Sequence, residues 1–148
     1  MFDTTTEITI KDLKNHIGFL ASDELEGRAS GTLGDEMAKD YIQKFFKNAS
    51  LPTKRFVEIQ EHYVPAERKW NLKPEDMTVK TYNIIATIPG NDPILKDEYV
   101  IIGGHYDGGA ATAAQLRKMT GEDKIYNNAD DNASGTATVS VSYTHLTL

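Results

Sequence analysis

Cysteine is absent from this chain of 148 residues, which excludes disulfide bonds and thiolate metal sites. Any bound metal would therefore have to use histidine, aspartate or glutamate side chains. The sequence also lacks an apolar run long enough to span a membrane. Basic runs are missing too, and the formal net charge is −6, which argues against nucleic acid or an anionic membrane as partner.

The start of the chain carries no visible targeting signal. Residues Met1 to Thr6 show neither the basic start nor the apolar stretch of a signal peptide. The sequence alone leaves three explanations open: a cytoplasmic protein, a processed chain or a truncated one. With 39% hydrophobic and 26% charged residues, the composition is ordinary for one globular domain.

Two amphipathic helices are predicted in the first third of the chain. Thr9 and Asp12 have the spacing of a capping box, and the helix that follows has one apolar face made of Ile10, Leu13, Ile17 and Leu20. Thr32 is expected to cap a second helix, with Asp35 at its N3 position. The apolar face of that helix consists of Met37, Ala38, Tyr41, Ile42, Phe45 and Phe46.

Three strands are predicted further along. A short one is expected at Phe56–Ile59, within a stretch that is otherwise loop. Tyr82–Ile88 is read as a strand that stops at Pro89-Gly90. Tyr99–Ile102 is the most apolar of the three, and we expect it to be buried in a sheet. Residues 108–122 are predicted to be a loop, with a short helix within it as the alternative.

Two acidic motifs hold the reactive side chains. His105 and Asp107 follow the apolar run and a Gly-Gly pair, so they should lie at the carboxyl end of a strand, where open α/β sheets bind ligands. Asp130 and Asp131 open a predicted helix, and a carboxylate there could bridge two metal ions about 3.5–4 Å apart. The alternatives are a chance surface pair and a capped loop in which Asp131 or Asn132 is the N-cap.

The chain resembles the zinc aminopeptidases of metallopeptidase family twenty-eight, the group that contains aminopeptidase Y. The resemblance covers roughly Ile8 to Ala137 and rests on segments that occur in the family's order: Phe19–Arg28, Gly31-Thr32 with the helix after it, Tyr82–Ala86 with Pro89-Gly90, Tyr99–Asp107 and Tyr126–Gly135. It implies a three-layer α/β/α fold with a mixed, mostly parallel sheet. It also implies two zinc ions, peptide substrates with a free N-terminus, and a secreted or periplasmic location.

Carried over by position, the resemblance implies that His105 binds one zinc ion and that Asp131 bridges both. Asp107 matches the carboxylate that orients the histidine and is the candidate catalytic residue, whereas Asp130 matches a position that is not a ligand. The implied reaction is attack of a zinc-activated water on the first peptide bond, with a glutamate as general base.

The family's remaining site residues are not in this sequence. A Glu-Glu pair and a later Asp and His are expected downstream, but only His145 follows Asp131 among residues of these types. We therefore expect residues 1–140 to be the N-terminal part of a catalytic domain, inactive by itself. Two alternatives share the fold: a glutaminyl cyclase-like zinc acyltransferase and a non-catalytic binding module.

Residues 141–148 read as the translation of a transposase sequencing adapter, without a helical face, so His145 is not counted as a ligand. Two other places in the sequence carry polar side chains that we do not expect to bind a metal. His16 is expected to be a surface or partly packed side chain on the first helix. Glu26 and Arg28, although within a family-like segment, are expected to form an exposed, salt-bridged turn. The oligomeric state is not predicted.

Overall fold

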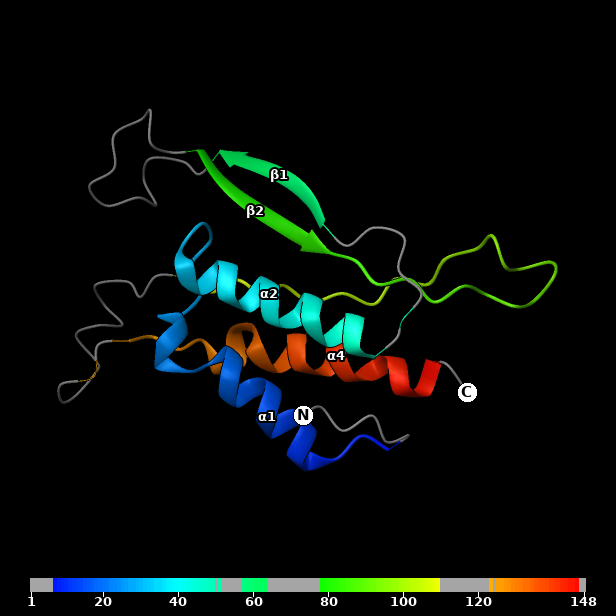
Figure 1. Cartoon of the computed structure of the whole chain (residues 1–148), viewed down its shortest axis with the longest axis horizontal. Helices are drawn as coiled ribbons and strands as arrows, with labels where there is room; N and C mark the ends of the chain where they lie inside the picture. The colour runs from blue at the N-terminus through cyan, green and yellow to red at the C-terminus, as the bar shows by residue number, and fades with distance from the viewer. Residues whose placement is uncertain are drawn as a thin grey trace.

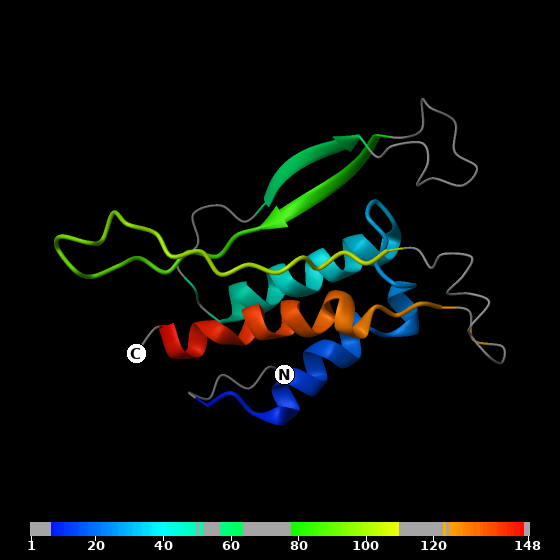
Figure 2. The ribbon, with the colours of Figure 1, turned by 180° about the vertical axis from the view of Figure 1, so that it is seen from behind.

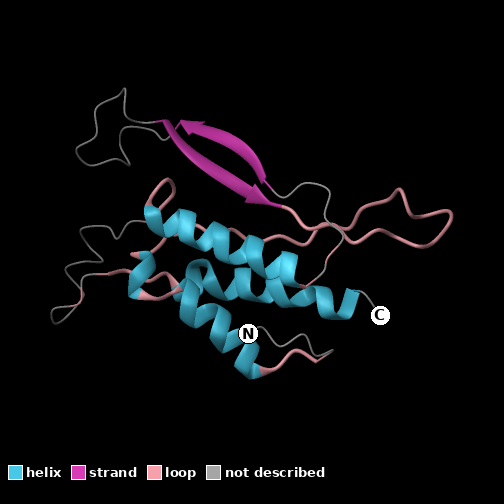
Figure 3. Ribbon diagram, in the orientation of Figure 1, coloured by secondary structure: helices cyan, strands magenta, loops and turns pink. Residues whose placement is uncertain are grey.

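Three helices and a β-hairpin make up most of the described chain (Figure 1). The computed structural model describes residues 7–49, 51, 57–63, 78–109, 123 and 125–146. Helices α1 (Ile10–Leu20), α2 (Leu33–Asn48) and α4 (Ser134–Leu146) pack together. Strands β1 (Val57–Tyr63) and β2 (Thr78–Ile84) form the hairpin, which lies beside α2 (Figure 3).

Helix α1 begins at the predicted capping box. The backbone N–H of Thr9 donates to Asp12 Oδ2 at 2.9 Å, and the N–H of Asp12 donates back to Thr9 Oγ1 at 3.2 Å. These bonds satisfy amide groups that the first helical turn leaves unpaired. Leu20 is buried at the far end of the helix, whereas Ile10 is exposed. The capping box is confirmed, and of the predicted apolar face only Leu20 enters the core.

His16 is more deeply packed than we expected. It is 3% exposed, its Nδ1 lies 2.9 Å from the Tyr41 hydroxyl, and its ring meets the Phe45 ring edge-on at 4.5 Å. The surface interpretation was wrong, because α2 brings two aromatic side chains over this face of α1. Burial lowers the pKa of His16, since it disfavours the charged imidazolium.

Helix α2 follows the prediction closely. The Thr32 hydroxyl accepts a hydrogen bond from the N–H of Asp35 at 3.3 Å. The predicted apolar face is buried at Ala38, Ile42, Phe45 and Phe46. These side chains form the main core cluster together with Leu20, Leu25, Leu51 and Ala133.

Helix α4 lies between α1 and α2 and continues into the last described residues (Figure 1). Ala137 and Val141, one helical turn apart, are both buried, and the Tyr143 ring meets the Phe45 ring at 5.8 Å. Residues up to Leu146 are therefore helical, although the sequence pattern of residues 141–148 did not predict a helix. β-Branched residues lower helix propensity by only a few tenths of a kcal/mol each, about 0.7 at most, so packing overrides it here.

The sheet of the described chain is a two-stranded antiparallel hairpin. Its register runs from Val57 opposite Ile84 to Tyr63 opposite Thr78. Strand β1 includes the part of the predicted strand that is described and continues beyond it. Strand β2 ends at Ile84, so the prediction for 82–88 holds for its first half only. Beyond it, the partly buried Ala86 and Ile88 still pack against the core.

The predicted buried strand at Tyr99–Ile102 was wrong. This segment forms no strand, and its side chains are 80%, 93%, 90% and 48% exposed in order. An apolar strand is buried only where neighbouring strands pair with its backbone and helices cover its faces. The described residues supply no such pairing, and the segment runs past α2 and α4 as an extended chain (Figure 2).

The expected mostly parallel sheet does not appear within the part of the chain that the structure describes. The one parallel pairing there is a single bridge between Ala29 and Gly108. Parallel strands need a neighbour in the sheet as well as a crossover connection, and the two described strands are a hairpin. The predicted loop at 108–122 lies mostly outside the described residues.

Candidate metal centre

Helix α4 holds His105 in place through its first turn. The Thr136 hydroxyl, which is buried, donates to the backbone carbonyl of His105 at 2.8 Å. A Cβ on Gly104 would already lie 3.4 Å from the backbone carbonyl carbon of Gly135, so the two backbones run close together. The His105 segment is therefore anchored directly beside the start of α4.

The Asp-Asp motif forms a single distorted turn, η4 (Ala129–Ala133), immediately before α4. Asp131 and Asn132 leave the helical conformation, with φ of −128° and −139°. Asn132 Oδ1 accepts a hydrogen bond from the N–H of Gly135 at 3.1 Å and so caps α4. Of the two capping candidates it is Asn132 that fills this role, which leaves the carboxylate of Asp131 available, with 78% of its side chain exposed.

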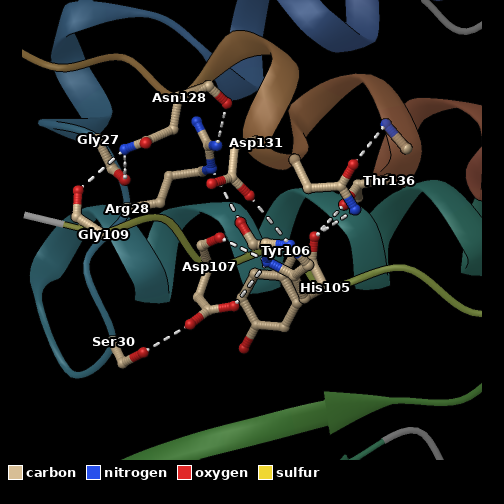
Figure 4. Close-up of polar contacts among 12 residues, drawn as sticks. Gly27, Arg28, Ser30, His105, Tyr106, Asp107, Gly109, Asn128, Asp131 and Thr136 are labelled. Atoms are coloured by element: carbon tan, nitrogen blue, oxygen red, sulfur yellow. Dashed lines mark hydrogen bonds and ion pairs between the residues drawn. The ribbon is translucent and has the colours of Figure 1, made fainter.

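His105 lies between the two carboxylates (Figure 4). Its Nε2 is 3.3 Å from Asp131 Oδ1. On the opposite side of the ring, Nδ1 is 3.2 Å from Asp107 Oδ1 and 3.1 Å from the Asp107 carbonyl oxygen. The structure thus brings together the three predicted site residues. Their side chains remain 45–78% exposed, so the group is open to solvent. Asp130 is exposed next to them.

The spacing of Nε2 and Asp131 Oδ1 suits a shared zinc ion. Zinc lies about 2.0–2.1 Å from histidine nitrogen and 2.0–2.2 Å from carboxylate oxygen, so two tetrahedral ligands are about 3.4 Å apart. The observed distance of 3.3 Å between Nε2 and Oδ1 matches that ligand-to-ligand separation. A zinc-binding histidine usually donates its other ring N–H to a hydrogen-bond acceptor. Such an acceptor at Nδ1 keeps the proton on Nδ1, so the lone pair of Nε2 is available to the metal. No group of three potential ligands occurs among the described side chains, so the fit concerns two ligands.

Arg28 is the site residue that the sequence analysis missed. It is completely buried, not exposed. Its Nε donates to the carbonyl of Tyr106 at 2.9 Å, and its two terminal nitrogens donate to the carbonyls of Asn127 and Asn128, each at 2.9 Å, and of Leu20. The prediction of an exposed, salt-bridged turn was therefore wrong for Arg28. Burial lowers the pKa of Arg28, and the charges of Asp107 and Asp131 oppose that shift.

The backbone around Arg28 makes further contacts with the same two motifs. Gly108 N–H donates to the Arg28 carbonyl at 2.8 Å. The buried Asn128 side chain donates to the carbonyls of Gly27, Gly109 and Tyr126 at 2.8–3.2 Å. We call residues Gly27–Gly31 the clamp loop, because it contacts both the 105–109 segment and the 126–131 segment.

The clamp loop also holds Asp107 directly. The Ser30 hydroxyl donates to Asp107 Oδ2 at 2.8 Å, so this carboxylate is bound on one oxygen and faces His105 with the other. Arg28 itself has φ of 58°, a left-handed conformation that is uncommon for residues other than glycine. Such a conformation persists where surrounding contacts fix it, as the four carbonyls do here.

Behind the site, Tyr106 and Asp35 link it to the core. Tyr106 donates its hydroxyl to the carbonyl of Tyr82 at 2.9 Å, and Asp35 Oδ2 accepts from the N–H of Gly31 at 2.8 Å. Burial raises the pKa of Asp35, and the nearby charge of Asp107 adds to the shift. The clamp loop is thereby tied at its end to helix α2.

Comparison with known families identifies the segment that carries both motifs. Residues 83–147, less than half of the chain, match the model of Peptidase family M28. The family implies a zinc-exopeptidase α/β fold, a hydrolase acting on peptides and a general dependence on zinc. No curated protein and no solved structure matches the chain. Among the described helices, none has the length and apolar character needed to cross a membrane.

Proposed function

We propose that His105 and Asp131 are zinc ligands of an aminopeptidase site related to that of aminopeptidase Y. The observation that carries the proposal is the 3.3 Å spacing between His105 Nε2 and Asp131 Oδ1, which is the separation that one tetrahedral zinc ion requires. The match of residues 83–147 to a metallopeptidase family supports the same assignment.

Each side chain has a distinct part in this proposal. His105 binds zinc through Nε2 while its Nδ1–H donates to Asp107. Asp131 has two carboxylate oxygens and would be the residue that holds both zinc ions of the pair. When bound, zinc lowers the pKa of a coordinated water and polarises the carbonyl of the scissile bond. Asp107 is fixed by Ser30 and holds the imidazole in one tautomer and orientation.

The substrates of the proposed enzyme are peptides with a free N-terminus, from which it removes the first residue. The described residues bring together two potential ligands, and catalytic zinc generally has three from the protein. We therefore expect this chain by itself to bind zinc weakly and to show little or no peptidase activity. Submicromolar binding of two zinc ions would contradict this expectation.

Zinc titration calorimetry on single-residue variants tests the ligand assignment. His105→Ala and Asp131→Ala should each abolish the zinc binding of the unaltered chain. Asp130→Ala is the matched control, because it removes the neighbouring exposed carboxylate and should leave zinc affinity within about twofold. Equal losses for Asp130→Ala and Asp131→Ala would mean that the motif attracts zinc by charge alone, and the assignment would fail.

A further inference from the structure

The clamp loop connects two segments that lie far apart in the sequence. Arg28 donates to Tyr106, 78 positions later, and to Asn127 and Asn128, 99 and 100 positions later. The first acceptor is next to His105, and the last is three residues before Asp131. One side chain therefore fixes the backbone beside both proposed ligands (Figure 4).

We propose that Arg28 is a positioning residue that sets the separation of His105 and Asp131; the inference rests on the zinc site proposed above. Its hydrogen-bond acceptors are all backbone carbonyls, so it acts on where the two segments lie. The planar guanidinium offers five N–H donors in a fixed arrangement. Four carbonyls from three parts of the chain converge on this arrangement.

Lysine cannot replace arginine in this role. Its ammonium group carries three donors at one point and cannot reach carbonyls spread around a planar fork. Arg28→Lys therefore keeps the positive charge but releases part of the contacts. Arg28→Met keeps the length of the side chain and removes both the charge and every hydrogen bond.

The two substitutions separate positioning from electrostatics. Arg28 is close enough to Asp107 and Asp131 to interact with their charges, so it should repel a zinc dication. On charge alone, Arg28→Met would strengthen zinc binding and Arg28→Lys would leave it unchanged. Positioning predicts that both variants weaken it. A loss of 10–100-fold is typical when a group that orients a ligand is removed.

A general loss of stability needs its own control. Ile42 is buried in the core on α2, and Ile42→Ala should destabilise the chain by creating a cavity. None of the hydrogen bonds of the clamp loop involves the Ile42 side chain. Circular dichroism should first establish a temperature at which all variants are folded, and zinc titration calorimetry is then done at that temperature.

The expected result is that Arg28→Lys and Arg28→Met each weaken zinc binding at least tenfold, while Ile42→Ala stays within twofold of the unaltered chain. Zinc affinity within twofold in the folded Arg28→Lys variant would overturn the proposal. A stronger affinity in Arg28→Met would show that the effect is electrostatic and would overturn it as well.

A second measurement needs no metal, so it distinguishes a failure of this inference from a failure of the zinc site. The Gly108 N–H and the Asn128 side-chain amide hold the clamp loop to the two segments. In the metal-free chain, NMR hydrogen exchange of these protons should be at least tenfold faster in Arg28→Lys than in Ile42→Ala. Equal exchange rates would overturn the positioning role even if zinc binds at His105.

Discussion

Replacing Gly108 by alanine would force a side chain against the clamp loop. A Cβ at this position would lie 1.9 Å from the carbonyl oxygen of Gly27, whereas real Cβ atoms essentially never approach closer than 3.0 Å. Because the obstacle is backbone, a change of rotamer cannot relieve the clash. The 105–109 segment would have to move away from the loop by more than about 1 Å.

The energetic cost follows from the contacts that this movement breaks. Overpacking of a well-packed site costs about 1–3 kcal/mol. Separation of the segments also removes the hydrogen bond from Gly108 N–H to the Arg28 carbonyl, worth about 0.5–1.5 kcal/mol. The expected loss is about 2–4 kcal/mol, which corresponds to a fall of roughly 5–15 °C in Tm for a chain of this size.

Gly109→Ala is the matched control, because a Cβ on Gly109 meets nothing within 4 Å. This exposed substitution should change stability by less than about 0.5 kcal/mol. Thermal unfolding followed by circular dichroism compares the two variants with the unaltered chain. If Gly108→Ala and Gly109→Ala unfold within roughly 2 °C of each other, the clamp loop does not contact the 105–109 segment as described.

Three further predictions concern other parts of the chain. Burial lowers the pKa of His16, so the unfolded chain binds more protons below about pH 6.5 and Tm should fall on acidification; His16→Gln should reduce this fall, and an unchanged slope would contradict it. Ile101 is 90% exposed in an unpaired apolar segment, so Ile101→Lys should reduce the aggregation measured by light scattering. Unchanged scattering would show that this segment plays no part in association. The sequence of the gene amplified from source DNA should differ from the present sequence at residues 141–148; native codons for the same residues would refute the adapter origin.

The local part of the fold could be predicted because it depends on nearby residues. The starts of α1 and α2 follow from Thr9 with Asp12 and from Thr32 with Asp35. A cap needs partners only three positions away. The helical apolar face of α2 is likewise visible as a spacing of three and four.

The parts that could not be predicted depend on distant partners. The apolar character of Tyr99–Ile102 indicated burial, but burial needs paired strands that no local pattern specifies. Arg28 has acidic neighbours in sequence, which suggested a surface salt bridge, yet its acceptors are carbonyls 78–100 positions later. The two glycines on either side of residues 28–30 were the available signal, since Gly27 and Gly31 both adopt positive φ and indicate a tightly folded loop.

The candidate site lies between these two cases. The contact of His105 with Asp107 follows from their spacing of two residues after an extended segment. The approach of Asp131 to His105 does not follow from either motif alone, and only the family resemblance implied that both side chains belong to one zinc site. The hydrogen bond from Thr136 to the His105 carbonyl creates that arrangement.

The most direct test of the metal site is NMR of the His105 ring nitrogens during zinc titration. Long-range ¹H–¹⁵N spectra distinguish the two nitrogens and report which one carries the proton. The proposed site predicts that Nδ1 keeps its proton, shared with Asp107, and that zinc shifts the Nε2 resonance, with no such shift in Asp131→Ala. Zinc at Nδ1, or a His105 resonance that does not respond to zinc, would contradict the assignment of His105 and Asp131 as a zinc-binding pair.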